Sequence, residues 1–132
     1  MPDAPLGIAP LSWTGRGAGA AILFLHGFPF DARLWSGQLA ALPDGWRGVA
    51  PDLRGFGASP TPAALTVEAH AADAFALLDH LGVEQAVVCG LSMGGYIALA
   101  MQRSAPRRIR ALVLADTRAE PDSDEARRQR MR

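Results

Sequence analysis

A serine set between glycines is the feature of this sequence that most directly indicates chemistry. Residues 90–94 read GLSMG, with Ser92 at the centre and Gly95 directly behind them. A serine hydroxyl attacks carbonyl carbons once a neighbouring base takes its proton. The pattern G-x-S-x-G predicts a sharp strand-to-helix turn, because only small flanking residues let the backbone fold so tightly. Such a turn would raise Ser92 above the sheet edge and point helix N–H groups at a developing oxyanion.

The same five residues would be an ordinary loop if nothing regular flanked them. An apolar run at residues 86–89 precedes them, and an apolar stretch at 92–105 follows and ends before Pro106. A strand and a helix in these places favour the nucleophile turn over a plain loop. No G-K-[ST] follows, as it would in a phosphate-binding loop, and the dinucleotide fingerprint G-x-G-x-x-G is absent. We therefore expect no cofactor.

The elements that must position Ser92 are visible as alternating apolar patterns. Continuous apolar runs indicate strands covered on both faces, and apolar residues at helical spacing indicate amphipathic helices. This alternation predicts an α/β fold: a mostly parallel sheet with right-handed crossovers and helices on both faces. The predicted strands are residues 20–25, 46–50, 86–89 and 109–115, and the predicted helices are 31–42, 66–81 and 92–105. Residues 6–13 are a weaker candidate for an edge strand or hairpin, and a turn is predicted after them at 14–17.

Capping residues mark the predicted helix ends. Thr66 is a predicted N-cap, Gly82 a predicted stop, and Asp31 a candidate cap for the helix that follows it. Residues 120–132 form a mixed-charge run, which indicates a solvated helix face or a frayed end.

Composition limits the kind of protein and its partners. The 132 residues include 13 basic and 13 acidic side chains, so there is no net charge to attract nucleic acid or an anionic membrane. The single cysteine, Cys89, excludes an internal disulfide, and no Cys/His set has the spacing of a zinc site. Neither a signal peptide nor an apolar run of about 18 residues is present. We expect one domain, a cytoplasmic location, a small-molecule partner, and no metal, nucleic acid or membrane partner.

Three motifs together resemble the α/β-hydrolase superfamily. They are LHGFP at residues 25–29, PDLRGFGAS at 51–59 and GLSMGG at 90–95, and they occur in the family's order and spacing across almost the whole chain. The resemblance implies that Ser92 is a nucleophile. It also implies that the backbone N–H groups of Phe28 and Met93 form the oxyanion hole.

Other polar residues near these motifs have a structural reading beside the chemical one. His26 would be a general base in the chemical reading, but the resemblance implies a structural hydrogen-bonding histidine at the strand end, and we favour that role. Asp52 and Arg54 would be an acid and a clamp, whereas the resemblance implies a brace or ion pair in the loop after their strand. His70 borders an apolar helix face and His80 lies on a polar one, so we expect packing and surface roles.

The partners that would activate Ser92 are incomplete in this sequence. In the family's chain order the acid and the histidine follow the nucleophile, but no histidine follows Ser92. Asp116 ends the last predicted strand and is a possible acid, although a loop residue is the more common reading of that position. Without a base, turnover should be small. We therefore expect residues 1–132 to be a single truncated domain, inactive alone, with its C-terminal part missing and an exposed edge strand at 109–115.

The substrate class follows from weaker resemblances. Residues 111–120 resemble 3-oxoadipate enol-lactonase-like and non-haem perhydrolase-like enzymes, which implies a small carboxylic ester or lactone. A serine at position 92 argues against haloalkane dehalogenases, which are similar to this chain but use an aspartate there. The alternative function is a non-catalytic module that binds a small molecule in the same fold. A third reading is an oligomerising fragment completed by another chain, and the oligomeric state stays open.

Overall fold

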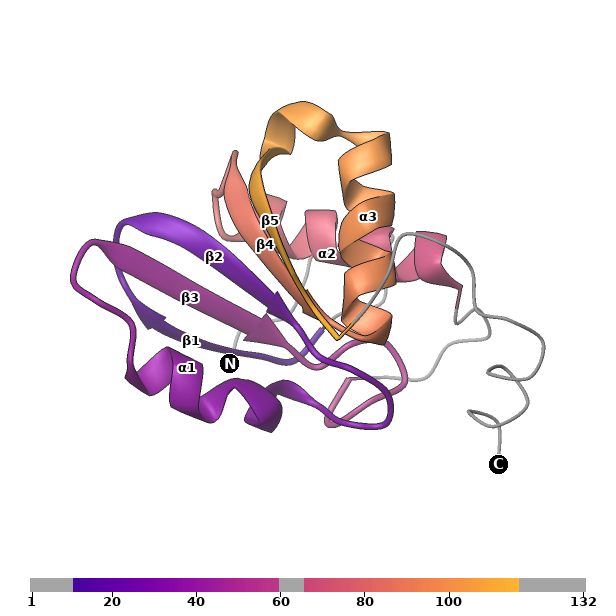
Figure 1. The fold of residues 1–132 in the computed structure, drawn as a ribbon, viewed down its shortest axis with the longest axis horizontal. Helices are drawn as coiled ribbons and strands as arrows, with labels where there is room; N and C mark the ends of the chain where they lie inside the picture. Colours follow the sequence, from indigo (N-terminus) through magenta and orange to yellow (C-terminus); the bar gives the residue numbers. More distant parts are fainter. Residues whose placement is uncertain (1–10, 60–65, 117–132) are drawn as a thin grey trace.

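A five-stranded sheet forms the centre of the computed structural model, which describes residues 11–59 and 66–116 (Figure 1). The strand order is β1-β3-β2-β4-β5. β1 runs antiparallel to β3, and the other neighbouring pairs are parallel. This arrangement confirms the mostly parallel α/β sheet. The strands are β1 (Trp13–Gly17), β2 (Ala20–Leu25), β3 (Trp46–Pro51), β4 (Ala86–Leu91) and β5 (Ile109–Ala115).

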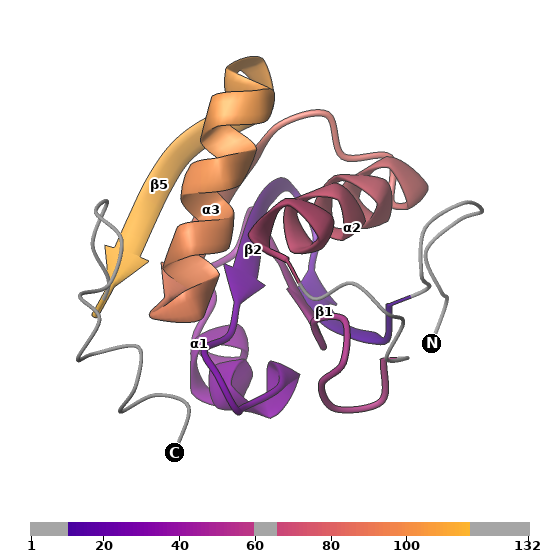
Figure 2. The same cartoon turned by 90° about the vertical axis from the view of Figure 1, so that its right-hand side faces the viewer.

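Helices cover both faces of the sheet, as predicted. α2 (Val67–His80) and α3 (Met93–Ser104) lie on one face, and α1 (Ser36–Ala40) lies on the other (Figures 1 and 2). Each side has its own apolar core. The α2/α3 side includes Leu23, Leu25, Val49, Leu77, Leu78, Val88, Ile97 and Met101, and the α1 side includes Phe24, Trp35, Leu39, Ala50 and Cys89. Short 3-10 turns cover Ala32–Trp35 and Pro106–Arg108.

The predicted helix caps are confirmed. The Thr66 side chain accepts a hydrogen bond from the Ala69 N–H at 3.1 Å, and α2 begins at the next residue. Asp31 accepts from the Arg33 N–H at 2.9 Å in the same way. Gly82 follows the end of α2 with φ +71°, a conformation that suits glycine and stops the helix.

Two local predictions are wrong. Residues 14–17 are not a turn but most of β1, because their backbone pairs with β3 in the register Thr14↔Ala50, a non-local contact that outweighs the glycines. The helix predicted at 31–42 is a 3-10 turn followed by the short α1. Gly37 is a poor helix former, and Gly45 at φ +89° turns the chain into β3 soon afterwards.

The predicted exposed edge is confirmed in β5. Val113 is 47% exposed and Leu114 is 41% exposed, and β5 lies at the outer edge of the sheet beside α3 (Figure 2). Residues 6–10 of the first strand candidate and the mixed-charge run at 120–132 lie outside the described residues.

Candidate active site

The motif residues meet at the carboxyl edge of the sheet. β2 and β4 are parallel neighbours that end in register, with Leu25 opposite Gly90. The residues that follow the two strands must therefore lie side by side. Ligands of open α/β sheets bind at this edge.

Ser92 occupies a strained turn between β4 and α3. Its backbone has φ 53° and ψ −112°, a conformation that few residues other than glycine adopt. Its N–H donates to the Ala115 carbonyl at 3.0 Å, and its carbonyl accepts from the Gly95 N–H at 2.9 Å. The turn that the sequence predicts at residues 90–94 is present.

Glycines make the turn possible because neighbouring backbone lies against them. A Cβ atom on Gly90 would collide with the Gly94 carbonyl, and one on Gly94 would collide with the Leu25 carbonyl. A Cβ on Gly27 would lie 3.4 Å from the Ser92 Cβ. The loop after β2 therefore packs directly on the turn that carries Ser92.

The two predicted oxyanion donors flank this contact. Met93 is the first residue of α3, so its N–H has no acceptor within the helix. Phe28 follows Gly27, and the turn that begins there is closed by the Phe30 N–H, which donates to the Gly27 carbonyl at 2.9 Å. The fold brings both donors to the edge that holds Ser92, and their role in stabilising an oxyanion stays a prediction.

His26 is held by backbone groups on both sides of its ring. Nε2 accepts from the Leu53 N–H at 3.0 Å, and Nδ1 lies 3.0 Å from the Gly27 carbonyl. Because Nε2 accepts, Nδ1 is assigned the proton and donates to Gly27. The ring is fully buried, and this burial lowers the pKa of His26, so it is neutral at pH 7. This geometry agrees with the structural role and leaves no ring nitrogen for Ser92.

Asp52 and Arg54 both brace the loop after β3, but they do so with different partners. The Asp52 carboxylate accepts from the Ala32 N–H at 2.8 Å and from the Ala58 N–H at 3.0 Å, so it joins two loops. Arg54 makes a two-pronged ion pair with Asp73 of α2, with both N···O distances 2.7 Å. The hydrogen bonds to Asp73 raise the pKa of the Arg54 guanidinium.

The remaining titratable candidates do not complete a triad. His70 is buried in α2, where desolvation lowers its pKa, and His80 is exposed near the amino end of β4. Asp116 follows β5, is exposed and has φ 49°. The adjacent residue, Ala115, accepts the Ser92 N–H. Asp116 therefore lies near the turn that carries Ser92, and its role as an acid stays a prediction.

Sequence reasoning missed two contributors. Asp73 is fully buried on the apolar face of α2, and a charge at that helical spacing was a signal that a partner must exist. Phe56 makes ring contacts with His26, Phe28 and His70. Its position in the PDLRGFGAS motif gave no sign of these contacts.

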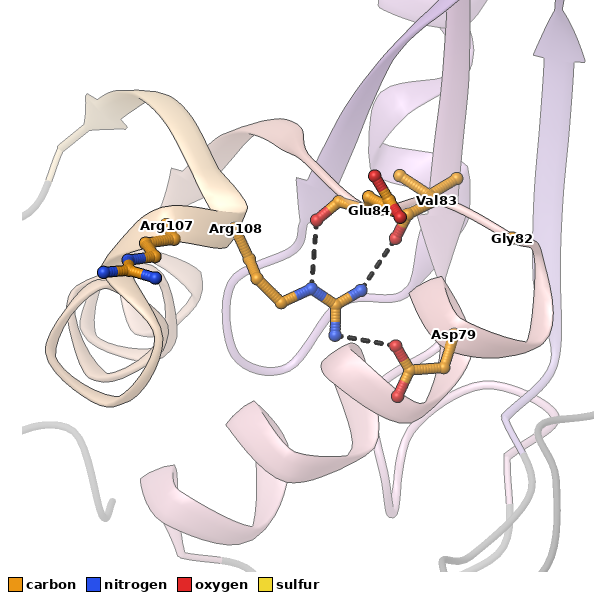
Figure 3. A pocket seen from close by; sticks show the side chains of 6 residues that line it. All are labelled: Asp79, Gly82, Val83, Glu84, Arg107 and Arg108. Carbon is orange, nitrogen blue, oxygen red and sulfur yellow. Dashed lines mark hydrogen bonds and ion pairs between the residues drawn. The ribbon is translucent and has the colours of Figure 1, made fainter.

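A pocket of about 540 Å³ lies at the opposite, amino edge of the sheet (Figure 3). The Arg108 side chain donates to the carbonyls of Glu84 at 3.0 Å and Val83 at 2.7 Å and pairs with Asp79 at 2.6 Å. Arg107 points away from this cluster (Figure 3). These contacts tie the end of α2 to the start of β5, so we interpret the cluster as structural.

The described residues, 11–59 and 66–116, contain neither a metal-binding cluster nor a membrane-spanning helix. Among these residues no group of three or more His, Cys, Asp or Glu side chains could hold a metal ion. In the same ranges, no helix has both the length and the apolar character needed to cross a membrane.

Residues 20–132 match the family described as alpha/beta hydrolase fold. Epoxide hydrolase 2 of Siraitia grosvenorii is 43% identical over 101 residues, which are 74% of this chain and 32% of that protein. The 3-oxoadipate enol-lactonase 2 of Acinetobacter baylyi is 33% identical over 106 residues, 80% of this chain and 40% of that protein. A thermophilic esterase structure from Thermogutta terrifontis has a TM-score of 0.86 and 45% identity, covering 92% of this chain and 46% of the esterase. The chain thus spans less than half the length of each of these three relatives.

Proposed function

Because this chain belongs to the alpha/beta hydrolase fold family, we propose that it carries the nucleophile of a serine hydrolase for small carboxylic esters or lactones. The observation that carries the proposal is the strained turn at Ser92, built between a buried strand and a helix N-terminus. The enol-lactonase and esterase among its relatives support an acyl substrate.

The proposed reaction follows from the atoms at the turn. The Ser92 Oγ bonds to the substrate carbonyl carbon while its proton passes to a base, and the carbonyl oxygen becomes an oxyanion. The Phe28 and Met93 N–H groups donate to that oxyanion. The C–O bond to the leaving alcohol then breaks and the alcohol takes the proton, which leaves an acyl group on Ser92. Water hydrolyses this ester in a second step.

A serine favours acyl substrates over the epoxides and haloalkanes named among the relatives. If Ser92 attacked an epoxide or an alkyl halide, the product would be an ether on the enzyme. An ether has no carbonyl carbon for water to attack, so the enzyme would not be regenerated.

Acetyl transfer from p-nitrophenyl acetate at alkaline pH tests the proposal in the 132-residue chain. Serine hydrolases stripped of triad residues keep about 10³-fold catalysis over water from the oxyanion hole and binding. All three histidines precede Ser92, so deacylation should be slow and one acetyl group should accumulate. The chain contains no lysine, which keeps the background low. Mass spectrometry should locate the acetyl group on Ser92 and find none there in Ser92→Ala. Absence of an acetyl group on Ser92 in the wild-type chain would contradict the proposal.

The second candidate is a non-catalytic module that binds a small ester or lactone. The observation that favours it is the placement of the histidines: both ring nitrogens of His26 contact the backbone, His70 is buried in α2, and His80 lies near the opposite edge of the sheet. Saturable binding of a small lactone by calorimetry, without acylation of Ser92, would support this candidate over the enzyme.

A further inference from the structure

We infer that Phe56 is a positioning residue for the oxyanion loop: its ring supports the Phe28 ring and thereby fixes the Phe28 N–H. This inference rests on the proposed function, which assigns that N–H to the oxyanion hole. Phe56 lies in the loop after β3 and does not touch the reacting atoms in this scheme.

The ring geometry carries the inference. The Phe28 and Phe56 rings meet edge to face, with centroids 5.9 Å apart and an interplanar angle of 90°. Phe28 is 51% exposed. In the part of the chain that the structure describes, Phe56 is the one aromatic residue whose ring meets that of Phe28. The Phe56 ring thus packs against a side chain that is otherwise half exposed.

Phe56 is itself fixed to the strand that precedes Phe28. Its N–H donates to the Leu53 carbonyl at 2.8 Å, and the Leu53 N–H donates to His26 Nε2 at 3.0 Å. The Phe56 ring also meets the His26 ring edge to face, with centroids 5.3 Å apart. His26 thus holds both the backbone turn and the ring that reaches Phe28.

The Phe56 ring also lies near α2. The His70 ring lies 6.4 Å from it at an interplanar angle of 37°. Two residues before Phe56, the loop is anchored to α2 by the ion pair between Arg54 and Asp73. Phe56 thus has ring contacts with two buried histidines, and its third aromatic neighbour, Phe28, is exposed.

A double-mutant cycle on the rate of Ser92 acetylation tests the inference. Phe56→Leu keeps an apolar side chain but removes the ring, so we expect the rate to fall about three- to tenfold, the range expected from an edge-to-face pair. Phe56→Tyr keeps the ring and should restore at least half of the wild-type rate. In a Phe28→Ala background the same Phe56→Leu change should alter the rate less than about twofold, because the contact is already absent. A role in packing alone would give equal rate losses in both backgrounds.

Two further measurements separate this inference from the proposed function. The Phe28 amide resonance should shift in Phe56→Leu and keep its wild-type position in Phe56→Tyr, as read by two-dimensional NMR without substrate. Because loss of the ring current alone can shift that resonance, the deciding NMR quantity is the order parameter of the Phe28 amide from ¹⁵N relaxation, which should fall in Phe56→Leu and stay at its wild-type value in Phe56→Tyr. Phe30→Leu is the matched control, since Phe30 is 52% exposed in the same loop, and it should leave the acetylation rate unchanged. An unchanged Phe28 order parameter, or no coupling in the cycle, would overturn the inference while leaving the acylation of Ser92 intact. Absence of any acetyl group on Ser92 would overturn the proposed function and this inference with it.

Discussion

At the scale of single residues, the main feature is the strained backbone of Ser92, which its neighbours hold in place. A non-glycine residue in such a conformation costs about 1–3 kcal/mol, which surrounding contacts must offset. Here the hydrogen bonds to Ala115 and Gly95 and the close packing of Gly90 and Gly94 do so. The Ser92 turn therefore depends on its small neighbours as well as on its hydrogen bonds.

Substituting Gly94 tests this dependence. Gly94→Ala places a methyl group against the Leu25 carbonyl, so we expect the free energy of unfolding to fall by about 1–3 kcal/mol or more. Gly37→Ala is the matched control, because no atom lies within 4 Å of the added carbon and Gly37 is helical. The control should stabilise the chain by about 0.5–1 kcal/mol. Urea titration measures both, and equal effects of the two substitutions would contradict the argument.

Burial of two histidines predicts acid sensitivity. Desolvation lowers the pKa of His26 and of His70 in the folded chain, whereas the unfolded chain titrates near the ordinary value of about 6.5. As pH falls below about 6.5, the unfolded chain binds protons that the folded chain does not, so the free energy of unfolding decreases. His70→Gln should lessen this decrease between pH 7 and pH 5 in denaturant titrations. A slope identical to that of the wild type would count against the buried histidine as its source.

At the scale of elements, the sequence predicts a strand or helix well when its pattern lies within the element itself, and poorly when the element depends on a distant segment. The apolar runs at 20–25 and 109–115 match β2 and β5 at both ends, because a continuous apolar run needs no partner to be recognised. β1 was missed because its glycine-rich residues become a strand only through pairing with β3. In the site, the spacing of the glycines around Ser92 was enough to predict the turn at residues 90–94. The Phe28–Phe56 and Arg54–Asp73 contacts join distant segments and were not predicted.

The Arg108 cluster connects two elements and gives a prediction at this scale. Arg108→Ala removes hydrogen bonds to the Val83 and Glu84 carbonyls and the pairing with Asp79. We expect the free energy of unfolding to fall by about 1–3 kcal/mol, since hydrogen bonds to charged groups are of that size. Arg107→Ala is the matched control, because that side chain points away from the cluster (Figure 3), and it should have little effect. Thermal unfolding of both variants would reveal a structural role, and similar small losses would argue against it.

At the scale of the whole molecule, different groups of residues lie at the carboxyl ends and at the amino ends of the parallel strands. The Ser92 turn and the loop after β2 lie at the carboxyl edge, and the Arg108 cluster lies at the amino edge. The apolar β5 lies along a third side, where its outer backbone groups have no neighbouring strand among the described elements. An apolar edge of this kind favours association.

The exposed edge predicts concentration-dependent association of the 132-residue chain. Val113→Lys places a charge on β5 and should shift the sedimentation profile toward the monomer, because an edge charge opposes strand pairing. Ala40→Lys adds the same charge on α1, away from β5, and should leave the profile as in the wild type. A wild-type chain that is monomeric at every concentration would contradict the prediction.

The hydrogen bond from the Ser92 N–H to the Ala115 carbonyl also links the Ser92 turn to local unfolding of the sheet. Edge strands open more readily than central ones, and their ends fray first. Each opening of the last residues of β5 releases Ser92 from one of the contacts that hold its backbone. Fraying at the end of an edge strand therefore reaches the backbone of Ser92, although Ser92 itself follows β4, an interior strand of the sheet.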